Sequence, residues 1–509
     1  MDISENHEAK RWRDHRHEQL YSPGKWQYIV LAGIFVMLSL AFHHSSNPIG
    51  ILAIFLTLAV LESHFPLISL FYLLIGLSAF QRYFAYCSLT LGGVPLYVTE
   101  FVIAINLLWL AISFFSNASI KLRPVSLFFL PFIGLGILLG LFGFWEHGIQ
   151  AIRHSAIAYY ALISVIVLLR VRGLDLAGNL LRTIYYSMLA GLSINIVNIY
   201  LNLFDEPFSK HGMPFLAAAT FLMFFFTHRG ERKTPGLRFY PIMILILYSM
   251  LVFPKSSYLI FFFAAVVVSL AYNLRFGNGI KSMFVDSPRV LVPLVLSLIV
   301  AILIAIIPGN SEILIGSSSE IISAAKIIQD TALGDFEIIP RDSGGMTLDE
   351  YLLTIEAQQS NFAWRIIVWR HAFDNFLKHP VLGIGFGISF APRELLKYKY
   401  KWYPDMRPHN SYLHILMRMG ILGLIVFCVA LVPVIYYLWR KNIALDRCRL
   451  NLLMMAFSGM LGFGVMAFLN VVHENAYGAV PFWTFAALAI LIATNPSKTK
   501  MVNSESSAD

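Results

Sequence analysis

The chain has 509 residues, of which 58% are hydrophobic and only 13% are charged. Soluble domains carry about 25% charged residues, and disordered or collagen-like chains lack this apolar content, so those classes are excluded. The three cysteines Cys87, Cys428 and Cys448 lie far apart, which argues against a disulfide framework and a thiolate metal site. The apolar residues come in blocks of about 20, which predicts an all-α polytopic membrane protein.

The formal net charge of +9 is carried by the loops between the apolar blocks. It does not form a basic face on a soluble element, so no nucleic-acid partner is expected. The first apolar run, from Trp26 to Phe42, is not followed by a small-residue cleavage pattern. We therefore expect a retained first membrane span and not a removed signal peptide.

Reading each apolar block as a helix of about 20 residues predicts about fourteen spans. They start near Trp26, Pro48, Pro66, Val94, Pro124, Ile152, Asn179, Pro214, Leu237, Ser257, Arg289, Ser411, Arg449 and Gly478. Because the break at Glu62-Ser63-His64 is short, one helix between residues 48 and 80 could be re-entrant.

Lysine and arginine are concentrated in every second loop, as expected for cytoplasmic loops. This pattern places both termini in the cytoplasm and one long segment on the outer side. The predicted organisation is a cytoplasmic tail in 1–25, spans 1–11 in 26–308, an extracytoplasmic loop with an amphipathic helix in 309–410, spans 12–14 in 411–493, and a cytoplasmic tail in 494–509.

The long outer segment is the most informative part of the sequence, because loops longer than about 15 residues are usually functional. Within it, apolar residues recur at helical spacing while Arg365 and Arg370 lie off that stripe. The apolar positions are Phe362, Ile366, Trp369, Phe373 and Phe376. The pattern predicts an amphipathic helix that lies along the membrane surface and contacts membrane lipids.

Several catalytic motifs are absent from the sequence. There is no G-x-x-x-x-G-K-[ST], no D-x-D pair and no H-E-x-x-H, and His409 and His414 are five residues apart, which is a poor spacing for a metal pair on one helix face. A reaction driven by a nucleotide inside the cell is therefore not expected. We expect no cofactor and no metal.

The strongest local signal runs from Arg407 to Gly423. Asn410 and Ser411 are good N-caps, so His409 should lie at the amino end of a helix, where partial positive charge favours anions and a neutral imidazole. A neutral imidazole is what a general base requires. A pyrophosphate leaving group would gain from the free helix amides and from Arg407 or another arginine above it.

Two glycines in the same run, Gly420 and Gly423, would let another helix approach closely. An alternative interpretation gives this stretch no catalytic role. In that case His409 helps to cap the helix, the glycines serve packing, and Arg418 extends to the membrane interface.

The spacing of His409-Asn410, nine residues, Gly420-x-x-Gly423 resembles the signature of the O-antigen ligase and O-antigen polymerase superfamily. A second segment resembles the R-x-x-x-W and P-x-x-G-x-G-x-G patterns of that superfamily. It contains Arg365, Trp369, Pro380, Gly383, Gly385 and Gly387. The resemblance implies structural roles for Trp369, Gly383, Gly385, Asn410, Gly420 and Gly423.

Members of that superfamily are glycosyltransferases of the bacterial inner membrane that build lipopolysaccharide and other surface polysaccharides. They take a glycan from undecaprenyl pyrophosphate on the outer face; ligases pass it to lipid A-core, and polymerases pass it to another lipid-linked glycan. The resemblance implies that His409 is the base or orients the acceptor, and that Arg365 contacts the pyrophosphate. It also implies an inverting transfer that needs neither nucleotide nor metal.

The chain departs from the family pattern at two points. The family usually has about twelve spans, and it often places an arginine after a serine where this chain has Pro254-Lys255-Ser256-Ser257. We expect Lys255 to replace that arginine as a phosphate contact, although lysine lacks the guanidinium fork. Arg153 and Lys210, near outer helix ends, are further expected contacts, although such residues often only extend to the interface.

The sequence leaves the acceptor open. The long chain and the lysine-rich outer loop favour a polymerase over a ligase. A lipid-linked oligosaccharide flippase is the alternative from another class, since such transporters can also have about fourteen spans. Internal repeats are typical of transporters, and no repeat is evident between the two halves of this sequence.

Overall fold

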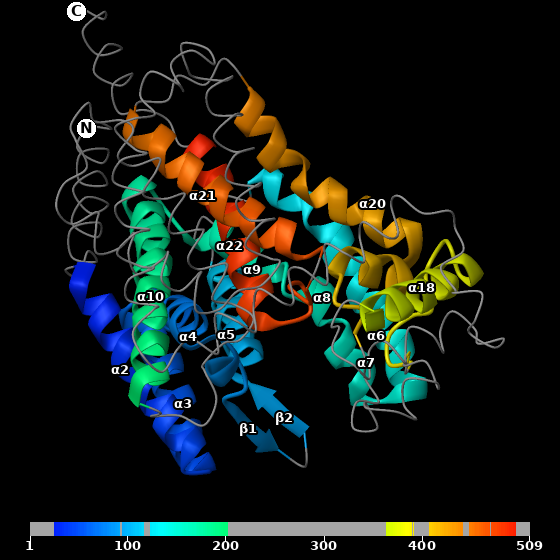
Figure 1. Cartoon of the computed structure of the whole chain (residues 1–509). Coiled ribbons are helices and arrows are strands. Elements are labelled where there is room, and N and C mark those ends of the chain that lie inside the picture. The colour runs from blue at the N-terminus through cyan, green and yellow to red at the C-terminus, as the bar shows by residue number, and fades with distance from the viewer. Residues whose placement is uncertain are drawn as a thin grey trace, which may run out of the picture. The chain divides into compact units, whose positions relative to one another are not determined.

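The computed structural model describes residues 25–91, 94–116, 123–201, 363–388, 390, 407–440, 447–468 and 470–494. These residues are mainly helical (Figure 1). The chain divides into two compact units. The N-terminal unit contains Met1–Lys121 and Arg170–Gly191, and the C-terminal unit contains Leu122–Leu169 and Leu192–Asp509.

The N-terminal unit is a helical cluster with one small hairpin. Its elements are α2 (Lys25–His44), α3 (Pro48–His64), α4 (Ile68–Ala85), β1 (Ser88–Leu91), β2 (Val94–Tyr97), α5 (Val98–Phe115) and the first part of α10 (Leu174–Leu201). Helix α2 packs against α3 and α4, and α4 packs against α5. Helix α4 is almost entirely buried in this unit.

A buried carboxylate stabilises the turn between α3 and α4. Glu62 accepts hydrogen bonds from the backbone amides of Leu67 at 2.6 Å and Ser69 at 3.0 Å, which have no partner within α4. The Arg170 Nη1 lies 2.7 Å from Glu62 Oε1. Glu62, Ser63 and His64 thus form the last turn of α3, and the break between the two helices lies at residues 65–67, three positions later than predicted.

The predicted span start near Val94 is wrong by four residues, and the all-α prediction misses a hairpin. Strands β1 and β2 pair antiparallel, with Ser88 opposite Tyr97, and α5 begins only at Val98. The physical reason is Pro95, because a residue that precedes proline is pushed out of helical backbone geometry.

The C-terminal unit holds both sequence motifs. Its elements are η1 (Pro124–Phe128), α6 (Leu130–His147), α7 (Ile149–His154), α8 (Ala156–Tyr159), α9 (Leu162–Arg170) up to Leu169, α18 (Ala363–Lys378), α20 (Ser411–Trp439), α21 (Arg447–Met466) and α22 (Ala476–Thr494). Helix α20 packs against α6, α18 and α22, and α21 packs against α22. Trp483 of α22 is fully buried, and its ring contacts those of Phe129, Phe132 and Phe427.

Within the described ranges, six helices are long and apolar enough to cross a membrane. They are Gln27–His44, Ile68–Ala85, Val98–Phe115, Pro124–His147, Ser411–Trp439 and Ala476–Thr494. The bent pair Ile149–Tyr159 and Leu162–Arg170, which meet at 49°, would make a seventh span. The protein is thus mostly helical with several candidate spans.

The total of fourteen spans stays a prediction. The predicted starts near Pro214, Leu237, Ser257 and Arg289 lie outside the described residues, as does most of the predicted outer loop.

Candidate functional site

Helix α20 is broken at Gly420, whose φ of 64° and ψ of −165° are not helical. In an unbroken helix, the amides of Ile421 and Leu422 would bond to the carbonyl oxygens of Met417 and Arg418. The break separates these two donors from these two acceptors. All four groups need other partners, because buried backbone polar groups are costly when left unpaired.

The segment from Pro380 to Gly385 supplies those partners. Ile421 N and Leu422 N donate to the carbonyl oxygens of Pro380 and Val381 at 2.8 and 3.2 Å, and Ile384 N and Gly385 N donate to those of Met417 and Arg418 at 2.8 and 3.1 Å. The two sequence motifs therefore form one unit held by backbone hydrogen bonds.

The partner at Gly420 is this loop and not a second helix, which corrects the predicted helix approach. A Cβ atom on Gly420 would lie 2.2 Å from the Val381 carbonyl oxygen. A Cβ atom on Gly423 would lie 2.2 Å from Cβ of Met419, in the same helix across the break. Both glycines thus accommodate the break itself.

The glycine-rich loop could be mistaken for a phosphate-binding loop, but its amides are already engaged. Gly383, Gly385 and Gly387 have φ values of 71°, 79° and 93°, which glycine adopts at little cost. Gly383 N donates to the His379 carbonyl oxygen at 2.9 Å, and Gly387 N donates to His154 Nδ1 at 3.1 Å. With Ile384 N and Gly385 N bonded to α20, this loop has a structural role.

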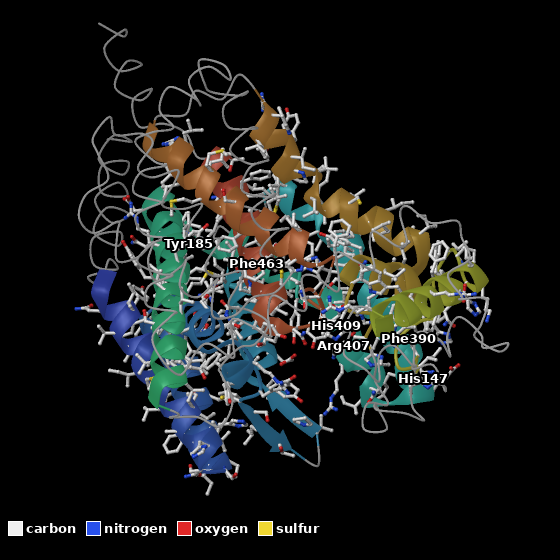
Figure 2. All side chains as sticks on the ribbon, viewed as in Figure 1. His147, Tyr185, Phe390, Arg407, His409 and Phe463 are labelled. Carbon is white, nitrogen blue, oxygen red and sulfur yellow. The ribbon has the colours of Figure 1, made fainter. Side chains whose placement is uncertain are left out.

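His409 lies two residues before α20, near Arg407 (Figure 2). Its backbone is left-handed, with φ of 48°. The next residue, Asn410, is the N-cap, and its side chain accepts a hydrogen bond from Leu413 N at 3.0 Å. Trp369 Nε1 donates to the carbonyl oxygen of Pro408 at 2.5 Å. The peptide before His409 is therefore attached to helix α18.

This contact gives the R-x-x-x-W spacing a physical meaning. Arg365 and Trp369 are four residues apart on α18, so they share one face of that helix. Trp369 is bonded to the peptide that precedes His409. The helix that carries Arg365 is therefore attached to the segment that carries His409.

The buried face of α18 differs from the predicted apolar stripe. Val368 and Ala372 are fully buried, whereas Phe373 is 47% exposed and Leu377 is also exposed. Phe362 and the side chain of Ile366 lie outside the described residues. The exposed Phe373 and Leu377 are consistent with a surface that contacts lipid.

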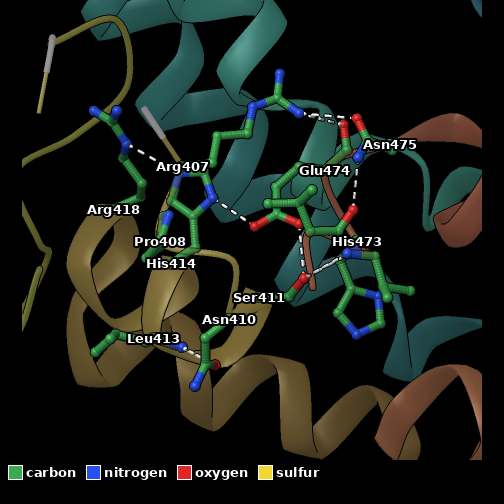
Figure 3. Close-up of polar contacts among 12 residues, drawn as sticks. Arg407, Pro408, Asn410, Ser411, Leu413, His414, Arg418, His473, Glu474 and Asn475 are labelled. Atoms are coloured by element: carbon green, nitrogen blue, oxygen red, sulfur yellow. Dashed lines mark hydrogen bonds and ion pairs between the residues drawn. The ribbon is translucent and has the colours of Figure 1, made fainter. Parts of the chain in front are cut away.

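Arg407 is fixed at one end of its guanidinium group. Its Nη1 donates to Asn475 Oδ1 at 3.0 Å and to the Glu474 carbonyl oxygen at 3.4 Å (Figure 3). In the described part of the chain its Nε and Nη2 groups donate to no protein atom. Among the described residues, Arg407 thus has donors left for an anion, while the Glu474 carbonyl and the Asn475 amide oxygen set its position.

Glu474 is buried beside Arg407 and binds two side chains of α20. Its Oε1 lies 2.5 Å from His414 Nδ1, and its Oε2 accepts from the Ser411 hydroxyl at 2.7 Å. Burial alone would raise the pKa of Glu474, but the hydrogen bond from His414, the hydrogen bond from the Ser411 hydroxyl and the Arg407 charge lower the pKa to about 2. The carboxylate is therefore ionised.

His414 connects this carboxylate to the glycine-rich loop. Because an ionised carboxylate only accepts, His414 Nδ1 carries the proton, and His414 Nε2 accepts from Arg418 Nε at 3.3 Å. Arg418 Nη1 donates to the carbonyl oxygens of Gly385 at 3.2 Å and Ile388 at 2.7 Å. Arg418 is buried and does not extend to the interface.

A family model described as O-antigen ligase matches residues 208–428, which contain both motifs joined at Gly420. Residues 208–428 are therefore similar to the O-antigen ligase family. A Rickettsia felis protein named as a polysaccharide ligase is 34% identical over 97 residues, which cover 18% of this chain and 22% of that protein. A Rickettsia conorii protein named in the same way is 32% identical over 98 residues, which cover 18% of this chain and 23% of that protein. The chain spans less than a quarter of the length of these relatives in the alignments.

Of the other cations predicted from the sequence, only Arg153 lies among the described residues. Arg153 is exposed on α7, next to His154, which accepts a hydrogen bond from Gly387 N. The helix that carries Arg153 therefore contacts the glycine-rich loop. Lys210 and Lys255 lie outside the described residues.

The roles of Glu474, His414 and Arg418 were not predicted from the sequence. All three are buried, and Glu474 lies sixty residues from His414. The available signal was an acidic residue two positions before the apolar run of α22, because a carboxylate that is buried at a helix end needs a partner. In the described part of the chain, no three His, Cys, Asp or Glu side chains are grouped as ligands for a metal ion.

Proposed function

We propose that this chain is a membrane glycosyltransferase of surface polysaccharide assembly, covering O-antigen, capsule or exopolysaccharide. It transfers a glycan from undecaprenyl pyrophosphate to an acceptor on the outer face of the bacterial inner membrane. The observation that carries this proposal is the placement of His409 at the amino end of α20, beside Arg407, within the O-antigen ligase match.

In the proposed reaction, His409 accepts the proton of the acceptor hydroxyl or orients that hydroxyl. The acceptor oxygen attacks the anomeric carbon and forms the new glycosidic bond with inversion. The bond from that carbon to the pyrophosphate breaks, and its electron pair leaves with the lipid pyrophosphate. The energy of this bond drives the transfer, so the scheme requires neither nucleotide nor metal.

Cationic groups stabilise the departing pyrophosphate in this proposal. Arg407 suits this role because its Nη1 is anchored while its Nε and Nη2 donate to no protein atom among the described residues. Arg365 is the second contact, on the helix that Trp369 attaches to the His409 segment. Arg153, Lys210 and Lys255 are proposed as additional cations, and the amide end of α20 adds partial positive charge.

The acceptor is proposed to be a lipid A-core rather than a second lipid-linked repeat unit. Both Rickettsia relatives are named as polysaccharide ligases, and the matching family model carries the same term. This supports the ligase direction over the polymerase direction that chain length and lysine content favour. The choice of acceptor is the first variable in the test below.

The test is a transfer assay with the purified full-length protein in proteoliposomes. Undecaprenyl-pyrophosphate-linked glycan from the source bacterium is supplied with chelator and without nucleotide. One arm receives lipid A-core and the other receives only a second lipid-linked glycan. We expect a new glycosidic product with wild type, and a loss of about 100-fold or more in His409→Ala and Arg365→Ala.

The control is His64→Ala, because His64 is exposed in the N-terminal unit. This variant should transfer at the wild-type rate. Glycan that crosses the bilayer without a new bond would support the flippase alternative instead. Equal rates in wild type and a folded His409→Ala variant would contradict the assignment of His409.

A further inference from the structure

We propose that Glu474 is a positioning residue for His409, and that His414 orients the Glu474 carboxylate. This inference rests on the proposed function of His409. Glu474 does not contact the reacting atoms in this proposal. It determines where the segment that carries His409 is held.

Ala467, Glu474 and Asn475 form hydrogen bonds with the chain on both sides of His409. Two residues before His409, Arg407 Nη1 donates to the Glu474 carbonyl oxygen and to Asn475 Oδ1. Two residues after it, Ser411 N donates to the Ala467 carbonyl oxygen at 2.7 Å. The segment between these two anchors is only three residues long, so it has little freedom to move.

The Ser411 side chain forms the centre of the second anchor. Its hydroxyl oxygen accepts from the amides of Val472 at 2.9 Å and His473 at 3.2 Å. The same hydroxyl lies 2.7 Å from Glu474 Oε2 and 3.2 Å from the Asn470 carbonyl oxygen, both acceptors for its single proton. The carboxylate thus joins a compact set of bonds that holds the first turn of α20.

These anchors matter because of the backbone at His409. Its φ of 48° is a left-handed conformation that a residue with a Cβ atom rarely adopts. Such a conformation persists only when the surrounding structure holds it in place. We infer that loosening Glu474 lets His409 relax toward ordinary backbone angles, which moves its imidazole.

His414 itself is not placed to act as the base. It is 2% exposed, and both of its ring nitrogens are used inside the protein. Nδ1–H donates to Glu474, and Nε2 accepts from Arg418. An acceptor hydroxyl has no nitrogen to approach, so His414 acts through its two protein partners, of which Glu474 is the one bonded to Ser411.

A change of Glu474 to glutamine separates the two bonds of the carboxylate. The Oε1 of the amide can still accept from His414 Nδ1–H. The amide NH₂, however, then faces the Ser411 hydroxyl oxygen, which already accepts two backbone amides. Glu474→Gln therefore disturbs the Ser411 anchor while side-chain size is kept.

The experiment measures kcat and donor KM in the proteoliposome assay, with undecaprenyl-pyrophosphate-linked glycan as the donor. We expect Glu474→Gln to lower kcat by about 10-fold to 100-fold, because small displacements of a reacting group have effects of this size. The donor KM should stay within about 3-fold of the wild-type value, since the phosphate-binding cations are unchanged.

A pair of His414 variants distinguishes the positioning role from a role in packing alone, because the two variants differ in where they place an N–H group. His414→Asn keeps an N–H group near the Nδ1 position, whereas His414→Gln places its amide near the Nε2 position. We expect His414→Asn to retain at least about fivefold more kcat than His414→Gln. If Glu474→Gln fails to fold, this pair decides the question.

Glu62→Gln is the matched control, because Glu62 is a buried glutamate of the N-terminal unit. It should lower thermal stability and leave kcat within about twofold of wild type. Absence of product with wild type would overturn the proposed function. An active wild type with unchanged kcat in folded Glu474→Gln, a rise in KM alone, or equal kcat in the two His414 variants would overturn the positioning role.

Discussion

The two units each contain a buried glutamate, and the groups bonded to each one differ. Glu62 is 1% exposed and binds two backbone amides and Arg170. Glu474 is 6% exposed and binds Ser411 and His414, which belong to the helix that follows His409. A buried carboxylate thus caps the start of a helix in one unit, and another supports a candidate reaction centre in the other unit.

The partners of Glu62 all lead back into the N-terminal unit. Arg170 Nη1 also donates to Asn106 Oδ1 at 2.5 Å, and Asn106 Nδ2 donates to Ser69 Oγ at 3.0 Å. Ser69 N is itself a donor to Glu62. This closed set stabilises the packing of its own helices. Burial and charge alone therefore do not identify a functional acid. The acid is identified by whether its hydrogen-bond partners belong to segments next to a candidate site.

The largest expected effect on stability comes from removing the cation in the N-terminal unit. Arg170→Met leaves the Glu62 charge buried without its guanidinium, which should cost about 3 to 5 kcal/mol of unfolding free energy. Activity per folded molecule should stay at the wild-type level. Denaturation in detergent measures the first quantity and the transfer assay measures the second.

The double variant Glu62→Gln with Arg170→Met should recover part of that loss, because it removes both charges. A fall in kcat of folded Arg170→Met as large as that of Glu474→Gln would erase the distinction between the two carboxylates.

Each unit has a glycine that lies against a backbone carbonyl oxygen. Gly420→Ala places Cβ 2.2 Å from the Val381 carbonyl oxygen, at backbone angles that are almost restricted to glycine. It should cost about 2 to 4 kcal/mol and abolish transfer, because it opens the pairing of the two motifs.

The matched variant in the N-terminal unit is Gly191→Ala, whose Cβ would lie 2.3 Å from the Ala79 carbonyl oxygen. It should cost about 1 to 3 kcal/mol with no change in kcat, since it only overpacks a helix contact. Thermal unfolding and transfer rate are measured on both proteins. Loss of transfer in folded Gly191→Ala would contradict the separation of roles.

The acid dependence of stability reports on Glu474. Its pKa is lowered from 4.5 to about 2 in the folded protein, so its stabilising effect is present above about 4.5 and is lost as the pH falls toward about 2. The unfolding free energy of wild type should exceed that of Glu474→Gln by about 2 kcal/mol at pH 7, as for hydrogen bonds to a charged group.

That difference should shrink when the two proteins are compared at about pH 5 and then about pH 3, between the unfolded and folded pKa values. Denaturation curves at each pH provide the measurement. A constant difference across this range would show that Glu474 is not ionised in the folded protein.

The smallest expected effects concern two N-caps. Asn47 accepts from Gly50 N at the start of α3, and Asn410 accepts from Leu413 N at the start of α20, both at 3.0 Å. Alanine at either position should cost about 1 kcal/mol. Only Asn410→Ala should lower the transfer rate, because only Asn410 adjoins His409. Equal transfer rates in the two variants would show that the cap does not influence His409.

Local sequence patterns predicted features that depend on neighbouring residues, such as helix caps and helix starts. The N-cap at Asn410 follows from the preference of a single residue type, and the predicted starts near Pro48 and Pro124 follow from apolar runs. The hairpin before α5 was not predicted, because Val94 and its neighbours are as apolar as a span and only Pro95 indicates that the backbone there is not helical.

Contacts between distant residues were not predictable in the same way. The carboxylate of Glu474 and the imidazole of His414 are brought together by the packing of α20 against α22, which no local pattern encodes. The break at Gly420 was interpreted as a helix contact for a related reason. A glycine pair indicates close approach but not which segment approaches.

Because of the break in α20, a change in bilayer thickness need not change the geometry of the candidate site. From Gly420 to Trp439 the helix has 20 residues, or about 30 Å at 1.5 Å per residue, which matches a hydrocarbon core. A thicker or thinner membrane is then accommodated by tilt of that part alone. His409 and the residues that hold it stay bonded to each other on the other side of the break, so transfer should tolerate lipids of different acyl length.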